Sequence, residues 1–161
     1  MKTLLHILAF CAVSSGATIA CASPPVSAER ALSEYCEPLI SGSAAAEVIK
    51  AARADGFQDF QVGRWPYLKA GELILGVSDA PRGCLVQAPA SMPFAQGIGL
   101  IDAWAARHPG AMRGAAAKGP DGAPVKVWVV PSEKRSLLLT QQTNGRGQKV
   151  LVFILAPLPT K

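Results

Sequence analysis

The chain has 161 residues, of which 50% are hydrophobic, and its 16 Lys and Arg outnumber its 11 Asp and Glu. This length fits one domain. The positive charge is concentrated in residues 110–161, which hold 8 basic and 2 acidic residues, whereas residues 23–109 hold 7 and 9. A basic C-terminal half suits an anionic polymer or lipid surface, and lysines on the wet face of a sheet are the simpler explanation.

Residues 1–22 have the pattern of a secretory signal peptide. Lys2 supplies the positive start, residues 4–13 form a short apolar segment, and Ala20 and Ala22 are the small residues of a cleavage site. The apolar segment is shorter than the roughly 20 residues of a membrane-spanning helix. We therefore expect cleavage after Ala22, a periplasmic or secreted bacterial product, and no transmembrane helix in the mature chain.

A lipid anchor is the alternative to simple cleavage. The segment TIAC places Cys21 where a lipidated cysteine would lie. The position three residues before such a cysteine is normally a large aliphatic residue, whereas here it is Thr18. We favour cleavage, followed by a mobile leader over residues 23–26 within a single domain over residues 23–161.

The cysteine count predicts a disulfide. Cys11 and Cys21 are lost with the signal peptide, which leaves Cys36 and Cys84. An even pair in an oxidising compartment is normally a disulfide. His108 is the one histidine that follows the signal peptide, so a Cys/His zinc site cannot be assembled. We expect no metal and no other cofactor.

Two helices are predicted near the N-terminus. Ser27 is a suitable N-cap for a helix over residues 28–37, and the proline and SGS segment that follow interrupt it. A second helix is predicted over residues 44–55, with Ser43 as its N-cap and Gly56 as the residue that ends it.

A β-hairpin is predicted next. Residues 57–72 are rich in aromatic side chains and are expected to be an irregular segment that lies over the following elements. Residues 72–78 and 84–89 are two short strands about a DAPRG turn, in which Pro81 and Gly83 are turn residues.

The clearest helix is predicted over residues 92–108. Ser91 caps it, and a Pro-Gly pair stops it. Gly97 and Gly99 are expected to let this helix approach the sheet closely, at a propensity cost near 1 kcal/mol each. Its buried face is expected to consist of Phe94, Ile98, Ile101, Trp104 and Ala105.

The remaining chain reads as an antiparallel meander. Its strands are expected within residues 125–131, 136–143 and 149–156, with an Asn-Gly hairpin signal before the last. The last strand is apolar on both faces and should be central. The order predicts an α+β domain, in which two N-terminal helices, a β-hairpin, an amphipathic helix and the meander form one curled sheet of five to six strands. No internal repeat is evident.

Five sequence features resemble a group of small exported proteobacterial proteins of unassigned function. They are an N-terminal helix with Cys36, then Gly56-Phe57, Trp65, the GEL of residues 71–73 and the CLV of residues 84–86. The resemblance covers residues 30–90. It implies a Cys36–Cys84 pair and no known catalysis.

Candidate catalytic groups each have a simpler structural explanation. His108 falls in the last turn of its helix, where an imidazole can bond the terminal carbonyls. A Cys–His nucleophile would need a free thiol, and no GxSxG motif is present. GIGLID, residues 97–102, falls inside an amphipathic helix and does not follow a strand, so it is not a dinucleotide loop.

Five residues are the candidate binding residues. Trp65 and Tyr67 could stack on sugar rings, although aromatic residues of a long connection more often pack against the core. Asp79 and Arg82 flank a tight turn beside the predicted disulfide, where a local salt bridge contributes little to stability. Trp128 lies on one of the basic strands.

The leading hypothesis is a non-catalytic exported envelope protein that binds another protein or an anionic envelope polymer, and not nucleic acid. The alternative is a periplasmic small-molecule carrier, with a cavity between the sheet and the third helix that is lined by Ile98, Trp104 and Trp128. A cell-wall-modifying hydrolase is the third class and would use a carboxylate such as Asp102.

Overall fold

The computed structural model describes residues 26–62, 65–115, 117–119 and 122–158. The signal peptide predicted for residues 1–22 lies outside the described residues, as does most of the leader predicted for residues 23–26. None of the helices in the described part of the chain is long and apolar enough to cross a membrane.

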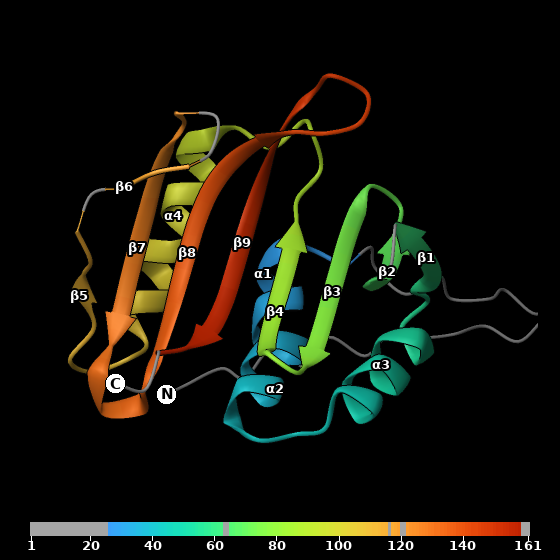
Figure 1. Cartoon of the computed structure of the whole chain (residues 1–161), viewed down its shortest axis with the longest axis horizontal. Helices are drawn as coiled ribbons and strands as arrows, with labels where there is room; N and C mark the ends of the chain where they lie inside the picture. The colour runs from blue at the N-terminus through green and yellow to red at the C-terminus, as the bar shows by residue number, and fades with distance from the viewer. Residues whose placement is uncertain (1–25, 63–64, 116, 120–121, 159–161) are drawn as a thin grey trace, which may run out of the picture.

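The fold is α+β, as predicted, with helices packed on one face of an antiparallel sheet (Figure 1). The helical elements are α1 (Ala28–Ala31), a π-helical turn (Leu32–Cys36), α2 (Glu37–Ser41), α3 (Ala45–Ala54), α4 (Phe94–Ala106) and a 3-10 turn (Pro131–Glu133). The strands are β1 (Gln58–Val62), β2 (Trp65–Ala70), β3 (Leu73–Asp79), β4 (Arg82–Gln87), β5 (Met112–Arg113), β6 (Ala117–Lys118), β7 (Pro124–Val130), β8 (Arg135–Thr143) and β9 (Lys149–Pro157).

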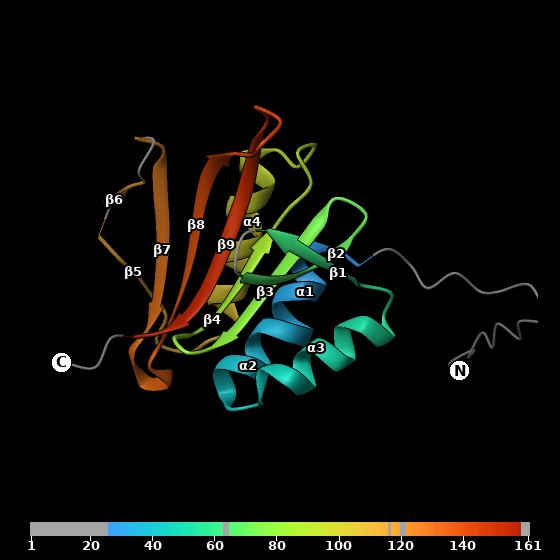
Figure 2. The same ribbon diagram turned by 45° about the vertical axis from the view of Figure 1, so that its right-hand side comes forward.

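The sheet is larger than predicted. It has nine strands in the order β1-β2-β3-β4-β9-β8-β7-β5, with β6 beside β7, rather than five or six. The segment predicted to be irregular forms the hairpin β1–β2 at one edge. β1 is the edge strand, and its residues Gln58, Asp59 and Gln61 are exposed, so the strand shows no clear apolar alternation. The strand direction turns strongly between β7 and β1 (Figure 2), as the twist of a sheet requires.

The sheet consists of two halves with similar topology. In the first, α3 precedes β1, β2, β3 and β4 and packs on β3 and β2; in the second, α4 precedes β5 to β9 and packs on β8 and β7. The last strands of the two halves, β4 and β9, pair antiparallel and join them. This repeat is not visible in the amino-acid sequence.

The two N-terminal helices are present, and the first is longer than predicted. α1, the π-helical turn and α2 follow one another directly. Pro38 therefore does not end this segment but follows directly on the π-helical turn, where the regular α-helical hydrogen bonding is already interrupted. The Oγ of Ser27 accepts a hydrogen bond from the Arg30 N–H at 3.1 Å, as expected of an N-cap.

The two ends of α3 differ in how well they were predicted. Gly56 follows the helix with a φ of +92°, and the N–H of Phe57 donates to the Ala52 carbonyl, so the predicted glycine end is confirmed. The predicted N-cap, Ser43, is wrong. The helix begins after Ala44, and no neighbouring side chain of the same segment caps it.

The third predicted helix is confirmed as α4, with shorter bounds. Its N-cap is Pro93, and the predicted cap by Ser91 is wrong. In the predicted stripe, Ile101, Trp104 and Ala105 are buried, whereas Phe94 and Ile98 are half-buried. This face packs on β8 and β7.

The predicted disulfide is present and connects the helices to the sheet. Cys36 and Cys84 are bonded across a sequence separation of 48, with their Cα atoms 5.3 Å apart. Both side chains are buried. A loop of this length stabilises the folded state by roughly 4 kcal/mol in the chain-entropy model. The bond holds the first helical segment against β4.

The core lies between the helices and one face of the sheet. One residue from each central strand forms a row on this face, and each is at most 3% exposed: Leu68, Leu75, Val86, Phe153 and Leu139. Tyr35 closes the core at the α3 end, where its hydroxyl donates to the Asp55 carboxylate at 2.5 Å and its ring meets Phe57 edge-on.

The close approach predicted for Gly97 is confirmed, and that for Gly99 is wrong. A Cβ at Gly97 would lie 2.6 Å from Cδ1 of Leu151, whereas a Cβ at Gly99 would meet no atom within 4 Å.

We expect Gly97→Ala to lower the free energy of unfolding by about 1–3 kcal/mol through overpacking. Gly99→Ala should raise it by roughly 0.5–1 kcal/mol, because alanine favours a helix. Urea denaturation of both variants tests these two expectations. Equal effects of the two substitutions on the free energy of unfolding would contradict the close packing at Gly97.

Burial of Tyr35, followed by its bond to Asp55, raises the pKa of the Tyr35 hydroxyl above its ordinary value. The folded state therefore holds this proton more tightly than the unfolded state. The resulting stabilisation is complete below the unfolded pKa of about 10 and is lost as the pH rises above it. We expect the free energy of unfolding to fall more steeply between about pH 9 and pH 11 in the natural chain than in Tyr35→Phe. Urea denaturation at several pH values measures this, and an equal fall of the free energy of unfolding in the two proteins would contradict the prediction.

Candidate functional site

The middle of the sheet face that carries no helix is apolar. In Figure 1 α4 lies behind β7 and β8, and α1 and α2 lie behind β4, so the strands present their other face to the viewer. An antiparallel sheet with one wet face normally places polar side chains there. Here the register brings a row of residues without charge onto this face: Phe60, Tyr67, Gly76, Leu85, Ile154, Leu138 and Val127.

A groove of about 660 Å³ crosses this face over β2, β3, β4 and β9. Its floor contains Gly76 and Gly83, where the strands have no side chain. The Tyr67 ring lies over Gly76, because a Cβ there would be 2.7 Å from a ring carbon. A Cβ at Gly83 would meet nothing within 4 Å, so space is open above it. The groove is also bordered by Pro66, Ser78, Pro81, Leu85, Ile154, Ala156, Pro157 and Leu158.

The groove results from a difference between the two halves of the sheet. Leu85 pairs with Ile154 at the join, Gly76 pairs with Leu85, and Leu138 pairs with Ile154. Gly76 and Leu138 therefore occupy equivalent positions in the two halves. The second half fills its position with a leucine side chain, whereas the first half has a glycine there, over which the Tyr67 ring lies.

Asp79 and Arg82 connect the hairpin to the helices. The Asp79 carboxylate accepts from the Ala45 N–H at 3.1 Å, at the start of α3, and so replaces the missing cap. The Arg82 guanidinium donates to the Leu39 carbonyl of α2 at 3.1 Å and lies 3.5 Å from Asp79. Both side chains lie on the helix side of the sheet, so the charged turn serves helix docking.

Trp128 and Tyr67, two of the predicted binding residues, lie on opposite faces of the sheet. Trp128 pairs with Leu137 of the core face, and its indole N–H donates to Asp102 of α4 at 2.9 Å. Tyr67 borders the groove on the other face. The Trp65 side chain lies outside the described residues. The five residues therefore do not form one site.

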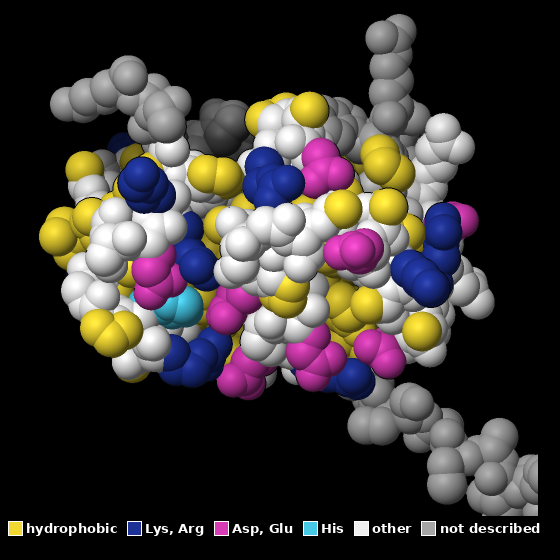
Figure 3. Space-filling view, turned by 90° about the horizontal axis from the view of Figure 1, so that it is seen from below, with side chains coloured by type: hydrophobic (Ala, Val, Ile, Leu, Met, Phe, Trp, Pro, Cys, Tyr) yellow, Lys and Arg dark blue, Asp and Glu magenta, His cyan; other side chains and the backbone are white. Residues whose placement is uncertain are grey.

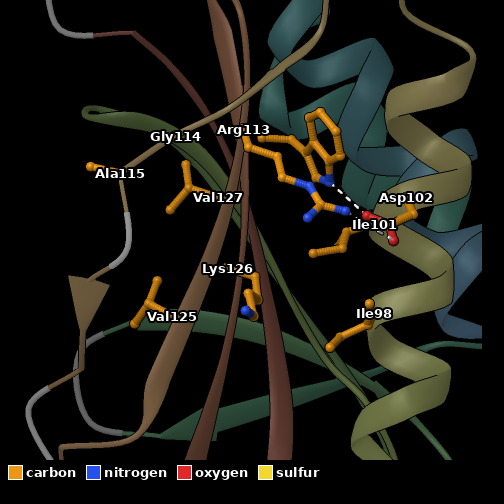
Figure 4. Close-up of a pocket in the computed structure, with 10 residues that line it drawn as sticks. Ile98, Ile101, Asp102, Arg113, Gly114, Ala115, Val125, Lys126 and Val127 are labelled. Atoms are coloured by element: carbon orange, nitrogen blue, oxygen red, sulfur yellow. Dashed lines mark hydrogen bonds and ion pairs between the residues drawn. The ribbon is translucent and has the colours of Figure 1, made fainter.

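A separate hollow on the helix side, of about 360 Å³, lies between α4 and β7 (Figure 4). Arg113 and Asp102 point toward one another across it, with 4.0 Å between guanidinium and carboxylate. Arg113 also lies over the Trp128 ring, 5.3 Å from its centroid. Of the carrier cavity proposed from the sequence, Ile98 and Trp128 border this hollow, whereas Trp104 is 1% exposed and belongs to the core. Asp102 thus accepts a hydrogen bond from Trp128 and forms a long ion pair with Arg113.

His108 lies in a cluster of charged residues at the C-terminal end of α4. Its Nδ1 is 3.0 Å from Glu133, and its Nε2 is 3.8 Å from Glu37 of α2. Glu133 also binds Arg135 at 2.9 Å, and the His108 ring stacks on Trp104. Figure 3 shows acidic and basic side chains interspersed at this end of the molecule. The cluster connects the N-terminal helices to the second half of the sheet.

Cofactor sites and relatives give no further assignment. Among the described residues, no group of three His, Cys, Asp or Glu side chains could hold a metal ion. No protein-family model matches the chain, and searches of curated proteins and of solved structures return no significant match.

The groove residues Gly76, Gly83, Leu85 and Ile154 were missed by sequence reasoning. One local signal was available, since a glycine inside a strand such as Gly76 often marks the close approach of another group. Whether that group is a ligand or a neighbouring ring depends on the pairing with β2, which is not a local property of the sequence.

Proposed function

We propose that this chain is an exported, non-catalytic binding protein, which holds an aliphatic chain in the groove of the helix-free face. The observation that carries the proposal is an apolar groove of about 660 Å³ on the side of the sheet that should be polar. Its volume lies within the range of ligand-binding clefts, which are mostly apolar. This favours the carrier class over the leading hypothesis from the sequence, and it moves the cavity to the opposite face.

The groove favours a hydrocarbon chain over a peptide backbone. It lies over paired strands in the interior of the sheet, whose backbone groups already bond to one another, so a peptide could not add as a further strand. Among the described residues, Arg82 is the charged residue that borders it, and Arg82 directs its guanidinium to the helix side. Four strands span about 14 Å, which suits a single hydrocarbon chain of medium length. Such a chain brings no polar group into the groove that would need a hydrogen-bond partner.

Gly83→Val tests the groove. Its side chain would enter open space above the floor, and valine favours a strand, so the variant should fold with equal or greater stability. Loss of two or three methylene contacts should weaken the binding of 1-decanol by about 10- to 50-fold. Titration followed by ¹⁵N NMR of the mature chain measures both the affinity and the residues that respond.

Ser136→Val is the matched control. Ser136 faces the same side of the sheet, pairs with Ala156, and does not border the groove. This variant adds apolar volume to the same face and should bind 1-decanol as the natural chain does. If the natural chain shows no binding, or if both variants bind equally well, the proposed function is wrong.

A second candidate function, binding of an anionic envelope polymer, is favoured by the charges along the β5–β7 edge. Arg113, Lys118 and Lys126 are exposed there, and the Arg113 side chain is 76% exposed. Within the described residues, the carboxylate that pairs with one of them is Asp102, at the limiting distance of 4.0 Å. Exposed cations of this kind attract polyanions at low ionic strength.

Long-chain polyphosphate is a suitable probe of this edge. We expect the double variant Lys118→Gln, Lys126→Gln to bind it more weakly and with a smaller salt dependence, because fewer counterions are exchanged. The double variant Lys50→Gln, Lys149→Gln removes the same charge elsewhere and is the control. Equal losses in the two variants would show that only the net charge matters and would refute a site at this edge.

A further inference from the structure

The helix-free face contains a second hollow, which adjoins the groove. It has a volume of about 360 Å³ and is bordered by Lys69, Ile74, Gln87 and the β8–β9 loop. On β2 and β3, Lys69 and Ile74 each lie two residues from the groove positions Tyr67 and Gly76. Because side chains alternate along a strand, they face the same side, about 7 Å farther along.

The second hollow is positively charged, unlike the groove. Lys69, Arg146 and Glu72 are the charged residues that border it, which leaves one excess positive charge. In the described part of the chain, no carboxylate lies within 4.0 Å of the charged nitrogens of Lys69 or Arg146. The Lys69 ammonium lies 5.3 Å above the centre of the Phe60 ring, which holds it at the border of the hollow.

The loop that carries Arg146 is ordered by its own side chains. The Asn144 Oδ1 accepts from the Arg146 N–H at 2.9 Å and from the Gln148 N–H at 3.0 Å. The Asn144 Nδ2 donates to Gln148 at 3.2 Å. This arrangement presents the Arg146 side chain from a defined backbone beside the hollow.

We infer that the ligand is a fatty acid, with its hydrocarbon chain in the groove and its carboxylate in the second hollow between Lys69 and Arg146. This inference rests on the proposed function, since it names the ligand of the same face. The apolar groove selects the chain, and the excess positive charge one row away selects an acid over an alcohol or an amine. The binding is non-covalent, and the chain length follows from the span of the groove.

The test compares three ligands that differ in the head group, namely decanoate, 1-decanol and decyltrimethylammonium. At about pH 7.5 and low salt, we expect decanoate to bind about 3- to 10-fold more tightly than 1-decanol, because the half-buried Lys69 and the exposed Arg146 each contribute modestly. The ammonium should bind more weakly than the alcohol. Added salt should reduce the preference for the acid without changing the affinity for the alcohol.

The double variant Lys69→Gln, Arg146→Gln should lose the preference for decanoate and keep its affinity for 1-decanol. The charge-matched variant Lys118→Gln, Lys126→Gln should keep both. If decanoate and 1-decanol bind the natural chain equally, or if the preference survives in Lys69→Gln, Arg146→Gln, the inference is overturned while the groove stands. If none of the three ligands binds, the proposed function itself fails.

Discussion

The pairing of β4 with β9 is the interaction on which the rest of the structure depends. It joins the two halves of the sheet through Leu85 with Ile154 and Val86 with Phe153. Both strands are central in the sheet, because each is hydrogen-bonded to a neighbour on both sides. On one face, Val86 and Phe153 form the core with the helices. On the other, Leu85 and Ile154 face no helix, and the groove lies there.

The helices are fixed to the same strands from one side. The disulfide at Cys84, the bond from Arg82 to the end of α2 and the bond from Asp79 to the start of α3 all leave the β3–β4 hairpin toward the helices. Groups that looked like a recognition surface in the sequence therefore hold the fold together. The opposite face, with its glycines and aliphatic side chains, carries no helix.

Local physics explains which elements were predictable. The helix that ends at Gly56, the hairpin signal before β9 and the central place of β9 follow from periodicity, turn residues and apolar composition, all of which act over a few residues. The edge hairpin β1–β2 was missed because its exposed polar side chains have no alternation to read. The helix caps at Ser43 and Ser91 failed because another element or another residue took their place.

The sequence by itself determined the α+β class and the unequal distribution of charge, and it predicted the Cys36–Cys84 disulfide. Only the tertiary structure decided which face each strand residue occupies. Shifting the register of a strand by one residue moves every side chain to the other face, and the register depends on partners far away in the chain. That is why Tyr67, Arg82 and Trp128, which formed one surface in sequence reasoning, lie in the groove, at the helix ends and beside α4.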